Sequence, residues 1–381
     1  MFSSFSPSAG AGARGTGGRG DEASCVGRNR VPNVVHQVWL GGTPKNGQFW
    51  AYVLSLASVL LNLRPERHLL HHDGNNASLP QCARVLATPV PAQRPAGVAS
   101  PTDKMQPRAI SDLVRLDLLL KHGGTYLDLD VFAVRRLDAL RRSCAAPVIA
   151  GVESRCTQVL PRRPVTAPGK REVICDDDPG AASYQRPASF PILTPHHAPL
   201  DAFVGWPATT RGNLAHAQAA VDAAGGRAVL NNGVLMSAPD ATFLHVLRQL
   251  YREFPLQPKD TLFGCTLAHR LAVALPGLIE LRPDLAPLPF RTREQCAAQM
   301  AVAPVWHVSG MGARTFRRNT LVHWGAMRRI LDAVQVGLER RRHELNPEQI
   351  GCIETAMREM RAKYLQTNVN VDHQNRTQRR N

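Results

Sequence analysis

The sequence predicts an α/β fold in which a mostly parallel, open β-sheet is flanked by helices. From Val31 onward, short β-rich apolar runs alternate with segments of helical periodicity, a pattern typical of β-α-β units. The chain has 381 residues, of which 44% are hydrophobic, so it can bury a sizeable core. Two of the runs adjoin glycine pairs, at Gly41-Gly42 and Gly123-Gly124, which favour tight turns between elements.

The elements follow from local patterns taken in chain order. Residues 34–40 form an apolar, β-rich run, which is typical of a buried first strand. The same criteria predict further strands at 67–72, 125–132, 229–237 and 302–308. Helical periodicity predicts helices at 49–63, 110–122, 241–254, 260–275 and 328–364. We expect the proline-rich residues 87–107 to form a loop.

These patterns divide the chain into one large domain and two flanking segments. Residues 1–30 are rich in Gly, Ser, Ala and Arg and are expected to be a flexible tail. Residues 31–330 form the α/β domain, in which 154–200 has no clear periodicity and is expected to be a long insertion or mobile loop. Residues 331–381 are expected to form a C-terminal helix and a polar tail.

The charge of the chain does not indicate nucleic-acid binding. The formal net charge is +16, from 46 Lys and Arg against 30 Asp and Glu. However, the arginines are scattered, aromatic residues make up only 6%, and no basic run is interleaved with aromatics. We therefore interpret the charge as a general attraction for anions, including phosphorylated ligands.

The chemistry is concentrated in residues 110–131. On a helix, Asp112 and Arg115 are three residues apart and therefore neighbours on its surface. After the glycine pair, the predicted strand would place Tyr126, Asp128 and Asp130 on one face, because side chains alternate along a strand. Carboxylates at the carboxyl end of such a strand lie where open α/β sheets bind ligands, and their hard oxygens suit Mg²⁺ or Mn²⁺.

Each part of this segment also has a simpler explanation. A lone D-x-D is common, and a helix-surface pair such as Asp112 and Arg115 is usually a solvated ion pair of small energetic value. The combination of helix pair, double glycine, apolar strand and paired carboxylates is much more specific than any one part.

That combination resembles the DXD-containing sugar transferases. This group includes yeast-type mannosyltransferases, animal galactosyl- and N-acetylglucosaminyltransferases and the glucosylating clostridial toxins. Their pattern S-D-x-x-R followed by G-G-x-Y-x-D-x-D stands here as Ser111-Asp112, Arg115, Gly123-Gly124, Tyr126, Asp128 and Asp130. The resemblance implies a GT-A-type nucleotide-sugar transferase fold with Mn²⁺ or Mg²⁺ as cofactor. It implies that Asp112, Arg115, Asp128 and Asp130 are the catalytic residues, with Asp130 binding the metal directly.

Three further stretches agree with this resemblance. Trp39 lies in the first predicted strand and would offer a flat face to a nucleotide base, although a Trp in an apolar strand equally suits a core. Asn231 and Asn232 lie in a run that resembles the second active-site strand of the family, and either would face sugar or acceptor unless it serves a turn. His323 lies in Leu321-Val322-His323-Trp324, which resembles a late element that closes the site. The implied donor-binding residues are Trp39, Asp112, Arg115, Tyr126, Asp128, Asn231 and Asn232, and the implied metal ligands are Asp128, Asp130 and His323.

The resemblance also implies a reaction. We expect metal-dependent transfer of a hexosyl unit to a hydroxyl group on a glycan, lipid or protein, with retention of configuration. UDP-sugars are the first expectation for the donor and GDP-sugars the second. Two alternatives remain at this point: a degenerate protein that binds a nucleotide sugar without turnover, and a basic nucleic-acid-binding protein.

The sequence is compatible with two cellular compartments. Eight cysteines without a C-x-x-C pair argue against a zinc site, and their even number permits disulfides. N-x-[ST] sequons stand at Asn76 and Asn375. The longest apolar stretch, 49–63, is shorter than the roughly 20 residues that a membrane span needs. We expect the Golgi or ER lumen if this chain lacks an N-terminal anchor, and the cytoplasm otherwise.

Overall fold

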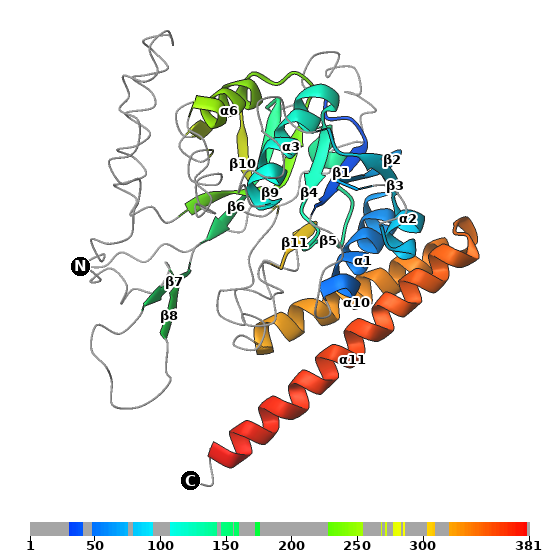
Figure 1. The fold of residues 1–381 in the computed structure, drawn as a ribbon. Helices are drawn as coiled ribbons and strands as arrows, with labels where there is room; N and C mark the ends of the chain where they lie inside the picture. Colours follow the sequence, from blue (N-terminus) through cyan, green and yellow to red (C-terminus); the bar gives the residue numbers. More distant parts are fainter. Residues whose placement is uncertain are drawn as a thin grey trace, which may run out of the picture.

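A seven-stranded sheet forms the centre of the molecule (Figure 1). The computed structural model describes residues 30–40, 48–74, 79–93, 107–142, 146–154, 156–159, 172–175, 228–253, 277–282, 303–308 and 320–378, with the isolated positions 268, 271–272 and 285. The strands are β1 (Val34–Trp39), β2 (Arg67–His72), β3 (Thr88–Pro91), β4 (Gly124–Leu127), β6 (Val148–Ser154), β9 (Ala228–Ser237) and β10 (Glu280–Arg282). Their order is β10-β6-β9-β4-β1-β2-β3.

Most neighbours in this sheet are parallel, as the sequence predicted. β1 pairs in parallel with β2 and β4, β2 with β3, and β6 with β10. Only β9 runs antiparallel, to β4 on one side and β6 on the other. The predicted α/β class is therefore confirmed. Two smaller pairs accompany the sheet, β5 (Val131–Ala133) with β11 (Val305–His307) and β7 (Cys156–Val159) with β8 (Glu172–Cys175).

Helices bury both faces of the sheet. α3 (Pro107–His122) and α6 (Thr242–Glu253) pack on one face, where they share a core with Val38 and Tyr126. α1 (Gln48–Ser58), α2 (Gln81–Leu86), α10 (Thr320–Arg341) and α11 (Pro347–Gln378) share the core that contains Trp39 and Leu70. Consecutive residues of β1 therefore serve opposite cores, as strand alternation requires. A short helix, α4 (Asp138–Arg141), follows β5.

The C-terminal helices are part of this core. Ile353, Met357 and Met360 of α11 are buried in the same cluster as α1, and Cys82 of α2 forms a disulfide with Cys352 of α11. The predicted boundary after residue 330 falls inside α10, which begins at Thr320. α11 also continues to Gln378, through residues that were expected to be a polar tail.

Other differences concern short elements. The predicted helix 49–63 is α1 followed by a π-helical turn, Val59–Leu63. The predicted loop 87–107 contains β3, and α2 had no prediction, because elements of four to six residues carry too little periodicity to be recognised. The tail up to residue 29, most of the predicted insertion 154–200 and most of the predicted helix 260–275 lie outside the described residues.

The turn between α3 and β4 requires glycine. Gly123 and Gly124 have φ angles of +61° and +98°, which L side chains rarely adopt. A Cβ atom at Gly124 would lie 2.5 Å from the carbonyl oxygen of Val34, which belongs to the neighbouring strand β1 and cannot easily move. This turn reverses the chain, so that the start of α3 lies beside the carboxyl end of β4.

Gly124→Ala is therefore expected to lower the free energy of unfolding by about 3 kcal/mol, from backbone strain and overpacking together. Urea denaturation followed by circular dichroism measures this change. Gly351→Ala is the matched control, because Gly351 lies in α11 with no atom within 4 Å of an added Cβ. That control is expected to be neutral or stabilising by up to about 1 kcal/mol. Equal midpoints for the two variants would show that the turn tolerates a side chain.

Candidate active site

The two aspartates lie in a turn between strands. β4 ends at Leu127, and β5 begins at Val131, whose backbone N–H donates to the carbonyl of Asp128 at 3.0 Å. The predicted continuous strand 125–132 is therefore wrong, and strand alternation is not why the carboxylates converge. Backbone contacts hold the turn instead: the N–H of Asp128 donates to Gly233 O, and the N–H of Val308 donates to Asp130 O, both at 2.9 Å.

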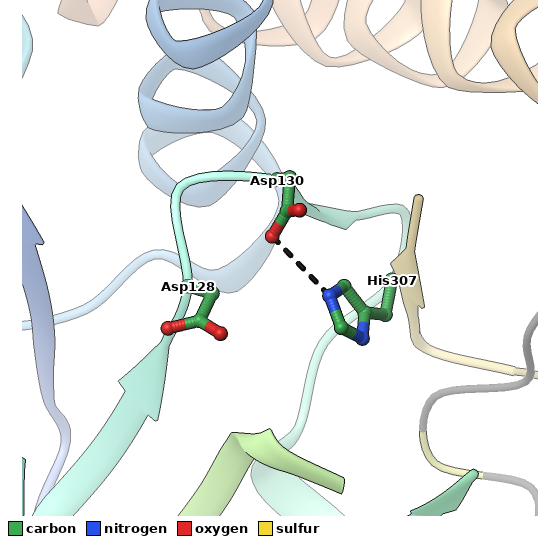
Figure 2. A group of neighbouring side chains, drawn as sticks. All are labelled: Asp128, Asp130 and His307. Atoms are coloured by element: carbon green, nitrogen blue, oxygen red, sulfur yellow. Dashed lines mark ion pairs between the residues drawn. The ribbon is translucent and has the colours of Figure 1, made fainter. Parts of the chain in front are cut away.

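A histidine far along the chain completes the group. β11 pairs antiparallel with β5 so that His307 lies opposite Val131, and His307 Nε2 lies 3.3 Å from Asp130 Oδ1. Figure 2 shows Asp128, Asp130 and His307 around one point. Sequence reasoning missed His307, although it predicted a strand at 302–308 that contains this histidine. His323, the predicted ligand, lies in the first turn of α10, and its side chain is outside the described part of the structure.

This group suits a divalent metal ion. Within the described part of the chain, Asp128, Asp130 and His307 each offer one ligand atom, and these atoms lie within 4.8 Å of one another. Oxygen atoms on opposite sides of one Mg²⁺ lie about 4.2 Å apart, so small side-chain rotations would suffice to bind an ion. His307 would bind it as the neutral imidazole, because a metal ligand must be deprotonated.

Arg115 ties the start of α3 to this turn. Its Nη2 lies 2.8 Å from Asp112 Oδ1 and 3.3 Å from Asp128 Oδ1, and Nη1 donates to the backbone carbonyl of Asn232. The guanidinium also lies over the ring of Tyr126, 4.5 Å from its centroid. At 5% exposure, Arg115 is not a solvated surface group, and loss of either carboxylate partner would leave its buried charge less well compensated.

Tyr126 orients Asp128. Its hydroxyl donates to Asp128 Oδ1 at 2.7 Å and lies 3.3 Å from Ser111 Oγ. Burial raises the pKa of Tyr126 well above its ordinary value, and the nearby Asp128 carboxylate raises it further against the opposing effect of Arg115. Tyr126 therefore remains protonated at neutral pH and holds one oxygen of Asp128 by a hydrogen bond.

Asn232 reaches the site through an irregularity in β9. The pairing of β6 with β9 shifts register between Ala150 and Gly151, and Asn232 lies in the bulge this creates. A bulge re-aims side chains, and here Asn232 Nδ2 donates to Asp112 Oδ1 at 3.0 Å. The structure thus brings Asp112, Arg115, Tyr126, Asp128, Asp130 and Asn232 together; the side chain of Asn231 is outside the described residues.

Trp39 is placed differently from the other predicted donor residues. It is 3% exposed, belongs to the core of α1 and α11, and contacts Phe49 and Tyr52 through T-shaped ring pairs. A base could stack on its face only after these neighbours moved. The sequence allowed Trp39 either a base contact or a place in the core, and its packing favours the core.

The fold and the site define an α/β protein in which carboxylates that could bind a metal ion lie at the carboxyl end of a sheet strand. Residues 91–146, which contain α3, β4 and both aspartates, match the family model described as "Glycosyltransferase sugar-binding region containing DXD motif". The chain therefore carries the sugar-binding region of a DXD glycosyltransferase, and the predicted enzyme class is confirmed. Its general reaction is glycosyl transfer from a nucleotide sugar to an acceptor.

A solved structure described as "PaToxG Glycosyltransferase" is 10% identical, and the alignment covers 88% of each chain with a TM-score of 0.30. A TM-score at this level does not establish a shared fold. Comparison with curated proteins finds no match.

Proposed function

We propose that this protein transfers a hexosyl unit from a nucleotide sugar to a hydroxyl acceptor in a metal-dependent reaction. The observation that carries the proposal is the convergence of Asp128, Asp130 and His307 beside the Asp112–Arg115 ion pair. UDP-sugars are the first candidate donors and GDP-sugars the second. The acceptor hydroxyl would belong to a glycan, a lipid or a protein, and retention of configuration rests on the family resemblance.

Charge supports the metal dependence. Asp112, Asp128 and Asp130 contribute three carboxylates, and Arg115 contributes one guanidinium, which leaves this cluster with two formal negative charges. A nucleoside diphosphate is itself anionic and would be repelled by such a cluster. A divalent cation would neutralise the excess, and it would also stabilise the charge that develops on the departing diphosphate.

The side chains supply orientation. Arg115 holds Asp112 and Asp128 in place, and Tyr126 fixes one oxygen of Asp128, so the site is organised before the donor arrives. Preorganised charge of this kind lowers a barrier without reorganisation during the reaction. The acceptor hydroxyl would attack the anomeric carbon from the face of the departing diphosphate, a reaction that depends on positioning more than on a strong base.

Mn²⁺ is the first candidate ion. Carboxylates suit both Mg²⁺ and Mn²⁺, but imidazole is a softer ligand that Mg²⁺ rarely accepts. A set of two carboxylates and His307 therefore favours Mn²⁺.

An oxidising compartment, such as the Golgi or ER lumen, is the proposed location. The disulfide between Cys82 and Cys352 supports it, since such bonds persist mainly outside reducing compartments. Among the described residues, no helix has the length and hydropathy needed to cross a membrane.

Nucleotide release from a panel of UDP- and GDP-sugars, with Mn²⁺ or with EDTA, tests the proposal. We expect one donor to be hydrolysed or transferred with Mn²⁺ and none with EDTA. Donor binding without turnover, even with a broad acceptor mixture, would favour the degenerate alternative. Failure to bind any donor, together with salt-sensitive binding to DNA or RNA, would favour the nucleic-acid alternative instead.

A further inference from the structure

A chain of buried polar side chains runs beneath the turn that carries Asp128 and Asp130. His68 Nε2 lies 2.8 Å from Gln37 Oε1, Gln37 Nε2 lies 3.1 Å from Ser55 Oγ, and Ser55 Oγ lies 2.6 Å from the carbonyl oxygen of Val131. Gln37 Nε2 also lies 3.5 Å from the carbonyl oxygen of Asp128. Gln37 and Ser55 are completely buried, and His68 is nearly so.

The donor and acceptor groups determine the direction of each hydrogen bond in this series of buried side chains. The Val131 carbonyl can only accept, so the Ser55 hydroxyl donates to it and must accept from the Gln37 amide. The Gln37 carboxamide oxygen therefore faces His68, whose Nε2–H donates to it. All the donors point the same way, toward the turn, which is the arrangement in which neighbouring hydrogen bonds strengthen one another.

The two carbonyls that receive these bonds flank the turn. The carbonyl of Asp128 lies at the start of the turn and accepts from Gln37. The carbonyl of Val131 accepts from Ser55, and Val131 follows Asp130 and lies opposite His307 in the β5–β11 pair. A shift of Val131 would therefore displace Asp130 and His307 together. Metal ligands need to be held to within about 0.5 Å, so such a shift matters for binding.

α1, which carries Ser55, and the π-helical turn that follows it make a second set of contacts farther along β5. Ser58 Oγ donates to Ser55 O at 2.7 Å and accepts from the N–H of Ala133 at 3.0 Å. Asn62 Nδ2 donates to the carbonyl of Ala133 at 2.9 Å. Ser55 and Ser58 are thus both fully buried and both make two hydrogen bonds, but only Ser55 contacts the residue next to Asp130.

We infer that Gln37 and Ser55 are positioning residues for the metal site, acting through the backbone carbonyls of Asp128 and Val131. This inference rests on the proposed metal-dependent function. Gln37 and Ser55 reach Asp128 and Val131 at their backbone carbonyls, and these contacts do not occupy the side-chain atoms that would bind the metal. Partners that orient metal ligands typically change metal affinity by about 10- to 100-fold when they are removed.

Mn²⁺ binding to the full chain, measured from the free-ion signal in electron paramagnetic resonance, tests the inference without requiring turnover. We expect Ser55→Ala to weaken Mn²⁺ binding about tenfold, the lower end of the range for such partners. Ser58→Ala is the matched control and is expected to leave Mn²⁺ affinity unchanged. Thermal unfolding of the two variants should be affected similarly, since each loses one buried hydroxyl and two hydrogen bonds.

The outcomes separate this inference from the proposed function. If the wild-type protein binds Mn²⁺ and the two serine variants bind it equally well, Ser55 has only a structural role and the inference is overturned alone. If the wild-type protein binds no Mn²⁺, the proposed metal site fails and the inference fails with it. Should Ser55→Ala not fold, Gln37→Met in β1 removes the hydrogen bonds from Gln37 to Ser55 and to the carbonyl of Asp128. Unchanged Mn²⁺ affinity in that variant would also overturn the inference.

Discussion

Asp130→Asn is expected to lower turnover by about a thousandfold while leaving the protein folded. Asparagine has the same shape as aspartate, and the backbone contact from Val308 N–H to the carbonyl of residue 130 does not involve the side chain. The substitution removes one negative ligand from the group of Asp128, Asp130 and His307. Loss of roughly 4 kcal/mol of transition-state stabilisation, within what a bound metal ion supplies, corresponds to a rate about a thousandfold lower.

The measurement is nucleotide release with Mn²⁺ at saturating donor, with circular dichroism to confirm folding. Asp240→Asn is a suitable control, because Asp240 follows β9 and its side chain is 87% exposed. The last residue of β9, Ser237, pairs with Gly124 at the start of β4, whereas Asp128 follows the end of β4. The φ of Asp240, +57°, is also one that asparagine tolerates well. Retained turnover in Asp130→Asn would show that the carboxylate is dispensable and that the metal site lies elsewhere.

Acidification is expected to destabilise the fold between about pH 6.5 and pH 4, through three buried histidines. Burial lowers the pKa of His36 and His68 to about 4 and that of His71 to about 3. Nearby positive charges act in the same direction: His122 and Arg67 on His36, and His36 and His122 on His71. His36 Nε2 donates to Gly123 O, and neutral His36 can accept a hydrogen bond from His71 at Nδ1.

The sign of the effect follows from proton binding. Below about pH 6.5 the unfolded chain protonates these histidines while the folded chain does not, so proton binding stabilises the unfolded state relative to the folded state as the pH falls. Stability is fully present above this pH and is lost progressively toward the folded pKa values. Lowering the pKa of one such histidine from 6.5 to about 4 corresponds to roughly 3 kcal/mol of folding free energy, a large fraction of the stability of a typical domain.

Urea denaturation at several pH values between 7 and 4.5 measures this dependence. His71→Gln should make the free energy of unfolding less steep in pH by up to one proton, whatever its effect at pH 7. His343→Gln is the control, because the His343 side chain is 78% exposed. Equal slopes for the wild type and His71→Gln would show that His71 is protonated in the folded protein.

The fold class could be predicted because its signals are local. The apolar run of β1, the helical periodicity of α3 and the double glycine before β4 are each contained in a short stretch of sequence. Tight spacing also brought Asp112, Arg115, Tyr126 and Asp128 into one hypothesis, and the structure joins them by two ion pairs and a hydrogen bond. The helix reverses into β4 within two residues, so the ends of these elements must meet.

Local sequence patterns therefore predicted the α/β class, the order of most of its elements and the carboxylate–arginine segment that runs from α3 to the turn before β5. Four features follow instead from tertiary packing: Asp128 and Asp130 lie in a turn, His307 joins them, Trp39 packs in the core, and Cys82 pairs with Cys352. Local patterns could not predict them because the contacts join residues far apart in the sequence. His307 reaches Asp130 through the register of two short strands, and Cys82 and Cys352 are 270 residues apart in sequence. Contacts of this kind depend on how helices and strands pack, which no local pattern encodes.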